Sequence, residues 1–259
     1  MNKKTGIIIG VLVVAFLALV GVSLWQKSQE ASEMGDYRLS TITDFIDQKD
    51  KQGVFADGKY DFTKVIPANE DSGNLPENVN GDPKAPVVIV EYADYQCDYC
   101  APMNPYVNKI VEEYDGKVAV VMRTYILSYH NNGVAAAAAA NAAAIQGYWE
   151  EYKDLLFANQ NEWFSASAKT RQKLYEQYFE TVTKGKGDLD KFREDMKSDA
   201  VKQKIAFDMG IGDKIDVGGT PYFYLDGEWI ENKNMTQAQY ADKMREVIDA
   251  KLKKLGIDK

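Results

Sequence analysis

The chain has 259 residues, of which 45% are hydrophobic and 27% charged, and its formal net charge is −8. It is too apolar for a disordered chain, and its two cysteines are too few for a disulfide scaffold. Its acidic balance provides no positive surface for phosphates, so nucleic acid is not an expected partner. These totals predict a globular protein with one domain of good size plus appendages.

A segment without charge runs from residue 7 to residue 25, just after Lys3 and Lys4. As a helix, these 19 residues would span about 28 Å, close to the ~30 Å hydrocarbon core of a bilayer. Because the lysines favour the cytoplasmic side, we predict a cytoplasmic stub and one N-terminal transmembrane helix within residues 1–25, with residues 7–25 in the lipid bilayer. The alternative is a signal peptide cleaved near residues 21–23. Both interpretations place the folded part outside the cytoplasm, tethered to the cell membrane if the anchor is kept.

The remaining chain divides into two parts by composition. Residues 26–80 mix scattered apolar side chains with turn-rich stretches, and we interpret them as a stalk and N-terminal extension with a β-like piece at 60–66. Residues 81–258 are predicted to form an α/β domain. Its expected elements are a strand at 87–92, a helix ending near 115, a strand at 118–127, a helical block at about 131–212, a hairpin at Asp226-Gly227 and a last helix capped by Thr236 and Gln239.

The reactive chemistry is concentrated in Cys97-Asp98-Tyr99-Cys100, where the first helix of this domain begins. A thiol at a helix N-terminus has a lowered pKa, because free N–H groups and the helix dipole favour an anion. Cys97 is therefore the expected nucleophile. Cys100 lies one turn further into the helix and can resolve a mixed disulfide formed on Cys97.

Other uses of the cysteine pair fit less well. A zinc site needs four ligands, and His130 is the only histidine in the chain. Covalent haem needs a histidine directly after the second cysteine, where this chain has Ala101. A purely structural disulfide remains open, although so short a loop adds little closure entropy. We therefore favour redox exchange without a metal, and we interpret His130 as a loop or capping residue rather than a base.

Four motifs in order carry a resemblance to a known family. They are the strand leading into Tyr95–Cys100, the alanine-rich helix followed by Gln146-Gly147-Tyr148-Trp149, the segment Leu155–Gln160, and Gly218-Gly219-Thr220-Pro221. Over residues 79–255 the chain resembles the DsbA-type thiol:disulfide oxidoreductases, above all their membrane-anchored forms. The resemblance implies a thioredoxin-like fold with an inserted helical domain, and it requires no dissociable cofactor.

Two further site residues follow from the resemblance. Thr220-Pro221 matches the loop in which the proline is cis, faces the active-site disulfide and binds an extended substrate; the alternative is an ordinary proline at a strand start. Glu91 matches the buried acid beneath the second cysteine. A carboxyl group in an apolar strand should have a raised pKa, which suits proton transfer with Cys100. The alternative is that Glu91 points to solvent.

The chain departs from the family between the cysteines, where Asp98-Tyr99 replaces a pair that commonly contains proline. An anionic side chain beside Cys97 disfavours its thiolate, so we expect a reduction potential below that of the strongest oxidants in the family. Asp98 and Tyr99 are also expected to contact substrate. Tyr95, Tyr99, Trp149 and Trp229 either form an apolar surface for unfolded chains or belong to the core.

The sequence thus predicts an exported, membrane-tethered enzyme that introduces disulfides into folding proteins. As the resemblance implies, its partners would be reduced or unfolded exported proteins and a quinone-linked membrane oxidoreductase that reoxidises it. One alternative reverses the electron flow, giving a reductase or isomerase kept reduced by a membrane electron donor. Another is a redox-silent binding or chaperone module in which the cysteine pair is only structural.

Overall fold

The computed structural model describes residue 22 and residues 37–258. The chain divides into two units, 1–36 and 37–259, and the second contains the elements below. In chain order they are α2 (Leu39–Lys51), a 3₁₀ turn (Glu70–Ser72), β1 (Asn78–Asn80), β2 (Val87–Ala93), α3 (Cys100–Glu113), β3 (Val118–Thr124), α4 (Gly133–Ile145), α5 (Trp149–Ala158), α6 (Gln160–Trp163), α7 (Ala168–Thr183), α8 (Leu189–Lys197), α9 (Asp199–Lys214), β4 (Tyr222–Leu225), β5 (Glu228–Trp229) and α10 (Gln237–Leu255).

The predicted membrane anchor at residues 7–25 lies outside the described residues, apart from residue 22. Among the helices that the structure does describe, none combines the length and apolar character needed to cross a bilayer.

The second unit is built on a mixed sheet with the strand order β1-β3-β2-β4-β5. β2 and β3 run parallel and are joined through α3, whereas β1, β4 and β5 add antiparallel neighbours. β2 is rich in β-branched residues and pairs on both sides, which is why the sequence reads as a continuous apolar run. The predicted hairpin is also present, with Asp226 and Gly227 at φ 55° and 83° between β4 and β5.

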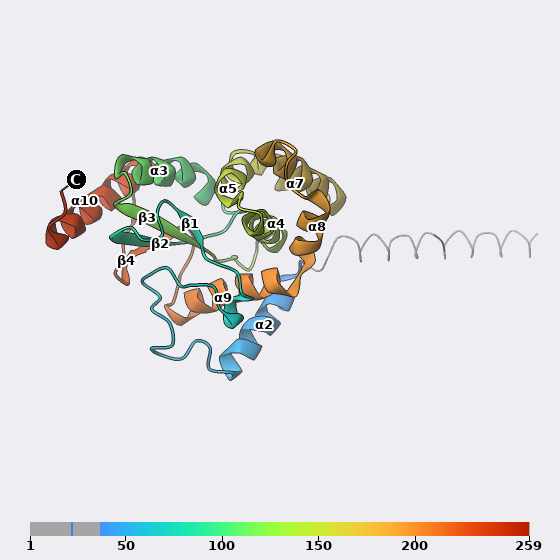
Figure 1. Ribbon diagram of the computed structural model, residues 1–259, viewed down its shortest axis with the longest axis horizontal. Helices are drawn as coiled ribbons and strands as arrows, with labels where there is room; N and C mark the ends of the chain where they lie inside the picture. The colour runs from blue at the N-terminus through green and yellow to red at the C-terminus, as the bar shows by residue number, and fades with distance from the viewer. Residues whose placement is uncertain (1–21, 23–36, 259) are drawn as a thin grey trace, which may run out of the picture. The chain divides into compact units, whose positions relative to one another are not determined.

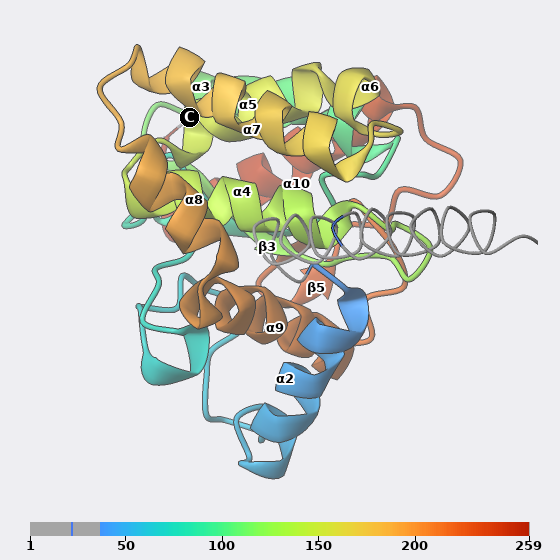
Figure 2. The same ribbon diagram turned by 90° about the vertical axis from the view of Figure 1, so that its right-hand side faces the viewer.

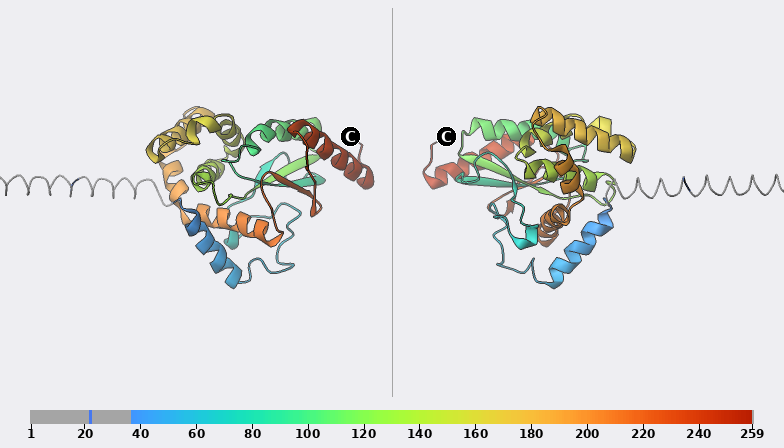
Figure 3. Two further views of the ribbon diagram at one scale, coloured as in Figure 1. Left: turned by 180° about the vertical axis from the view of Figure 1, so that it is seen from behind. Right: turned by 45° about the vertical axis from the view of Figure 1, so that its right-hand side comes forward.

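Helices cover both faces of the sheet (Figure 1). Because side chains alternate along a strand, Ile89 points to the face covered by α3 and α10, while Val90 and Tyr92 point to the face covered by α9. Figure 3 shows the same layers from behind. Glu91, two residues after Ile89, therefore shares the face covered by the helix that begins at Cys100.

The helices between β3 and β4 form one block built around α4 (Figure 2). Residues 133–143 of α4 are all buried, and most are alanines. Their short side chains let α5, α8 and α9 pack closely against α4. Cys97 and Cys100 pack in one apolar cluster with side chains of this helical block. The two cysteines therefore lie where the block meets the sheet.

Residues 37–80 are part of this second unit. α2 lies against α9, and β1 forms an edge of the sheet. The expected β-like piece at 60–66 is wrong, because this segment forms turns. Asp61 accepts hydrogen bonds from the backbone N–H and hydroxyl of Thr63, at 3.1 and 2.6 Å, which favours a turn over a strand.

A buried arginine holds the same segment on the sheet. Arg123 in β3 is fully buried and pairs with Glu77, with Nε 2.6 Å from Oε1. Its guanidinium also donates to the carbonyls of Phe62 and Lys64, at 2.7 and 2.9 Å. Backbone groups that would bond a neighbouring strand therefore bond a side chain instead.

We expect Arg123→Met to lower the free energy of unfolding by about 3–5 kcal/mol, because it leaves the Glu77 carboxylate buried without its partner. Urea unfolding at neutral pH measures this loss. Arg245→Met is the matched control: its pair with Glu113 is partly exposed and should cost at most about 1 kcal/mol. Equal losses in the two variants would contradict the assigned role of Arg123.

Candidate active site

Cys97 lies in the turn between β2 and α3, and Cys100 is the first residue of α3. The Cys97 carbonyl accepts hydrogen bonds from the backbone N–H groups of Cys100 and Ala101, at 3.1 and 3.3 Å, so Cys97 leads directly into the first helical turn. Both cysteines are free thiols, and Cys97 and Cys100 are 3% and 1% exposed. The small exposure leaves only a narrow approach to the Cys97 sulfur.

The surroundings of Cys97 favour its thiolate. Its pKa is lowered from 9.0 to about 6, chiefly because the Cys100 thiol donates a hydrogen bond to it. The Thr220 side chain and the backbone N–H groups of Tyr99 and Cys100 add to this effect, while burial opposes it. Cys97 is therefore largely ionised at neutral pH, which makes it both a nucleophile and a good leaving group.

Cys100 shows the opposite behaviour. Burial raises its pKa well above 9.0, and the neighbouring Cys97 sulfur and the Glu91 carboxylate raise it further. Cys100 therefore stays protonated at neutral pH. It needs a proton acceptor before it can attack a mixed disulfide, and a proton donor when it leaves.

The Thr220–Pro221 peptide is cis, as expected from the sequence. In its protonated form the Cys97 thiol donates to the Thr220 carbonyl at 3.3 Å, so this loop faces the Cys97 sulfur. The Thr220 hydroxyl is buried, and its oxygen has no hydrogen-bond partner within residues 37–258. Ionisation of Cys97 supplies an acceptor for this hydroxyl, which explains its contribution to the lowered pKa.

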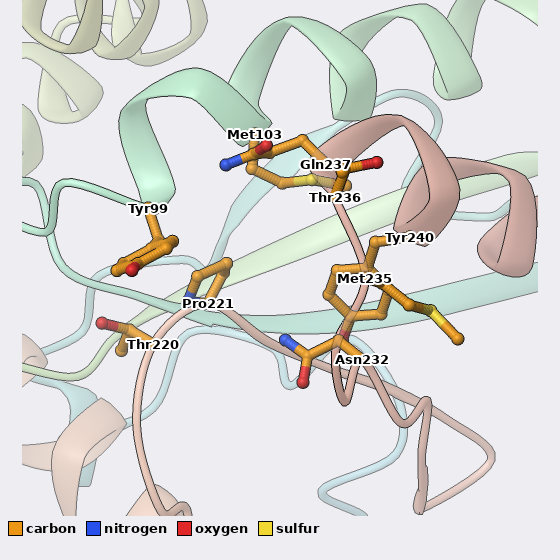
Figure 4. A pocket seen from close by; sticks show the side chains of 9 residues that line it. All are labelled: Tyr99, Met103, Thr220, Pro221, Asn232, Met235, Thr236, Gln237 and Tyr240. Carbon is orange, nitrogen blue, oxygen red and sulfur yellow. The ribbon is translucent and has the colours of Figure 1, made fainter.

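A pocket of about 90 Å³ lies beside this loop (Figure 4). It combines the helix start, the Thr220–Pro221 loop and the beginning of α10. Tyr99, 69% exposed, and Met235, 40% exposed, give it an accessible apolar rim. Asp98 is exposed but does not line the pocket. The full lining is Tyr99, Met103, Thr220, Pro221, Asn232, Met235, Thr236, Gln237 and Tyr240.

The four aromatic residues singled out in the sequence divide into two pairs. Tyr95 and Trp149 are buried, and the Trp149 indole N–H donates to the Tyr95 hydroxyl at 3.1 Å. Tyr99 and Trp229 are exposed, and Trp229 stacks on Tyr222 with ring centroids 5.0 Å apart. The first pair belongs to the core, and the second contributes to the surface.

Glu91 is buried in β2, so it does not point to solvent. Burial raises its pKa from 4.5 to about 7, although the charge of Lys153 opposes the rise. Lys153 in α5 is itself buried and bonds Asn108 and Asp154, at 2.8 and 3.0 Å. Near neutral pH the Glu91 carboxyl is thus present in both its protonated and its ionised form.

Sequence reasoning did not find several residues that shape this site. Lys153 lies in a helix whose spacing gives no sign of the acid in β2. Gln160 donates to the carbonyls of Tyr95 and Cys97, at 2.8 and 3.1 Å, and so fixes the turn. Gln160 ends the segment Leu155–Gln160, one of the motifs behind the family resemblance, and that motif was the only sign of its importance. The neighbours of Asp94 and His130 were also missed; Asp94 Oδ2 lies 2.7 Å from His130 Nδ1.

In the part of the chain that the structure describes, no group of three or more His, Cys, Asp or Glu side chains is arranged to hold a metal ion.

Comparison with known proteins agrees with this fold and site. A family model described as thioredoxin matches residues 74–250. The chain belongs to the thioredoxin family. Among relatives of this thioredoxin-family chain, the Na⁺/H⁺ antiporter NhaA 3 of Salinispora tropica is 32% identical over 192 residues, which cover 74% of this chain and 27% of that protein. This chain thus spans about a quarter of the antiporter's length.

Two other relatives match over most of their own length. The probable disulfide bond formation protein D of Bacillus cereus is 27% identical over 179 residues, covering 67% of this chain and 78% of that protein. The crystal structure of a thioredoxin-like oxidoreductase from Silicibacter pomeroyi superposes with a TM-score of 0.53 at 28% identity, covering 70% of this chain and 98% of that one. These matches confirm the resemblance to DsbA-type proteins that the sequence predicted.

We expect Glu91→Gln to stabilise the protein at pH 8 but not at pH 4. The folded-state pKa of Glu91 is raised from 4.5 to about 7. Between these two pH values the folded protein binds more protons than the unfolded chain. The free energy of unfolding therefore falls as the pH rises from 4.5 to about 7. Glutamine removes a penalty of about 3 kcal/mol above pH ~7. Urea unfolding at both pH values measures it, with Glu151→Gln on the surface of α5 as control. A gain of equal size at pH 4 would contradict the explanation.

We expect Thr220→Val to raise the pKa of Cys97 by about one unit, because the thiolate loses a hydroxyl donor. Thiolate absorbance or alkylation rate against pH measures the change. Thr43→Val, at an exposed position of α2, should leave the Cys97 pKa unchanged. A folded Thr220→Val protein with the native Cys97 pKa would show that the hydroxyl does not reach the sulfur.

Proposed function

We propose that this protein is a thiol:disulfide oxidoreductase that introduces disulfides into exported proteins through Cys97 and Cys100. The observation that carries this proposal is the opposite shift of the two thiols: the pKa of Cys97 is lowered to about 6, whereas that of Cys100 is raised well above 9.0. A structural disulfide needs no such asymmetry. An exchange enzyme does, because one sulfur must leave readily and the other must stay protonated until it acts.

The proposed reaction begins with the Cys97–Cys100 disulfide. A substrate thiolate attacks the Cys97 sulfur, forms a mixed disulfide and displaces Cys100, which takes a proton from the Glu91 carboxyl group. A second substrate thiolate then attacks the substrate sulfur of the mixed disulfide and displaces Cys97 as a thiolate. The substrate loses two electrons and gains a disulfide, while the cysteine pair is reduced to a thiolate and a thiol.

The neighbouring pocket supports an extended protein substrate. Its apolar rim, formed by Tyr99 and Met235, lies beside Thr220 and Pro221, and a thioether such as that of Met235 adapts to side chains of varied shape. In this proposal Thr220 offers its backbone to the substrate chain. Asp98 lies outside the pocket and contacts substrate only at its margin.

Renewal of the disulfide requires a partner that accepts two electrons. In this proposal a quinone-linked thiol oxidoreductase in the membrane takes this role. The segment at residues 7–25 would hold the protein at the cell membrane, with its N-terminus in the cytoplasm and its catalytic domain outside. The name of the Bacillus cereus relative, a probable disulfide bond formation protein, supports the oxidising direction.

One observation favours the reverse direction as a second candidate. The Cys97 pKa of about 6 lies nearer to the value of about 7 known for thioredoxin, a reductant, than to the value of about 3.5 for the strongest oxidant. A less stabilised thiolate gives a less oxidising disulfide. A reductase or isomerase kept reduced by a membrane electron donor would use the same residues.

We expect the protein to oxidise a reduced, unfolded model protein faster than buffer does. Cys97→Ser should abolish this activity, while Cys100→Ser should trap mixed disulfides on Cys97. Mass spectrometry detects the trapped species, and a thiol assay follows the substrate. Oxidation no faster than in buffer, with binding of the unfolded protein that survives Cys97→Ser, would instead support the redox-silent binding or chaperone module.

The reduction potential separates the two directions. We expect a value between about −120 mV, that of the strongest oxidant, and about −270 mV, that of thioredoxin. Equilibration with glutathione measures it. A value near about −120 mV would contradict the only moderately lowered pKa of Cys97. A value near about −270 mV would favour the reductase.

A further inference from the structure

His130 lies beside the active-site turn and is held there by Asp94. The Asp94 carbonyl accepts from the Cys97 backbone N–H at 3.0 Å, and its Oδ1 accepts from the Gln96 N–H at 2.9 Å. The other carboxylate oxygen, Oδ2, accepts from the Leu127 N–H at 3.0 Å and lies 2.7 Å from His130 Nδ1. One fully buried residue therefore joins the turn of Cys97 to the loop of His130.

A second tie keeps the loop in the same place. The Gln96 side chain accepts from the Asn132 backbone N–H at 2.7 Å. Directly after it, Gly133 approaches so closely that a Cβ there would lie 3.1 Å from Asp94 Oδ1 and 2.7 Å from Ile126 Cγ2. The chain just after His130, at Asn132 and Gly133, is thus fixed against Gln96 and Asp94, which precede Cys97.

The charges that face His130 come from several elements. Asp94, Cys97 and Asp98, all on the active-site turn, each favour its protonated form; the Asp94 hydrogen bond is the largest cause of its raised pKa, and burial opposes it. Tyr37 and Arg38, just before α2, line the same cavity as His130. The Tyr129 ring meets the imidazole edge-on, with centroids 4.5 Å apart. The His130 side chain is only 11% exposed, which limits screening by solvent.

We propose that His130 is a positioning residue whose protonation is coupled to the oxidation state of Cys97. The proposal rests on the proposed dithiol chemistry and adds its regulation by pH. When the disulfide is reduced, a thiolate appears on Cys97 and attracts a proton to His130. When the disulfide forms, that negative charge disappears and the proton is released more easily. Coupling of this kind is reciprocal, so a protonated His130 also stabilises the thiolate by the same amount.

The coupling gives the disulfide a dependence on pH that the cysteines alone do not explain. Two electrons and one proton, taken up by Cys100, convert the disulfide to the thiolate and thiol. Between the His130 pKa values of the oxidised and reduced proteins, reduction takes up an additional fraction of a proton at the imidazole. In that range, acidification makes the disulfide a stronger oxidant than it would be with a neutral side chain at position 130.

Since His130 is the only histidine, its ring signals in a proton NMR titration of the full chain identify themselves. We expect the imidazole pKa to be higher in the dithiol protein than in the disulfide protein, by about 0.3–1 unit. In Cys97→Ser, which has no thiolate at this position, the value should match that of the disulfide protein. The same pKa in the dithiol and disulfide proteins would overturn the proposal, whether or not the variants below fold.

Variants at the loop test the reciprocal effect. His130→Gln should raise the Cys97 pKa by the same amount and reduce its thiolate fraction about twofold at pH 6 for a half-unit change. His130→Lys should restore a low Cys97 pKa. The reduction potential measured with glutathione should then lose the additional pH dependence that titration of the imidazole causes. Thr43→Val, at an exposed position of α2, is the control and should leave the Cys97 pKa unchanged.

An unchanged Cys97 pKa in folded His130→Gln would count against the coupling. Failure of the proposed function is a separate result: the purified protein would then not oxidise unfolded substrates, although the His130 titration would still respond to the state of the cysteine pair.

Discussion

The site depends on the buried carboxylate of Asp94, which stands directly after the central strand β2. Its three hydrogen bonds from N–H groups and the imidazole hold together the turn after β2 and the loop after β3. A charge so deeply buried is tolerated only when such donors replace water. These bonds fix where Cys97 stands relative to the sheet, and Thr220 and Gln160 then meet it from elements far along the chain.

The two thiols illustrate how little chain separates opposite environments. Cys97 sits in the turn, where backbone N–H groups and neighbouring side chains reach its sulfur. Cys100, three residues later, is buried within reach of the Glu91 charge, so a negative charge on its sulfur is costly. Cys97 precedes α3 and receives hydrogen bonds there, whereas Cys100 is the first residue of the helix and is fully buried.

Local pattern was enough to predict most of the sheet and the cysteine turn. The apolar runs of β2 and β3, the Asp-Gly hairpin and the capping box of Thr236 and Gln239 are signals within a few residues, and each is present. The cis peptide before Pro221 followed from the family resemblance. What failed or was missed depends on partners distant in sequence. The segment at 60–66 has strand-like composition but bonds Arg123, and no spacing in the sequence pairs Lys153 with Glu91 or His130 with Asp94.

The bonds of Arg123 to the segment before β1 limit how far the N-terminus of this protein can be truncated. A shortened version starting at residue 81, where the sequence predicts the α/β domain to begin, would lack Glu77 and the two carbonyls that surround the guanidinium. The cation would then be stranded beneath the sheet. The natural unit for expression begins near residue 37, ahead of α2, so that the segment enclosing Arg123 is retained.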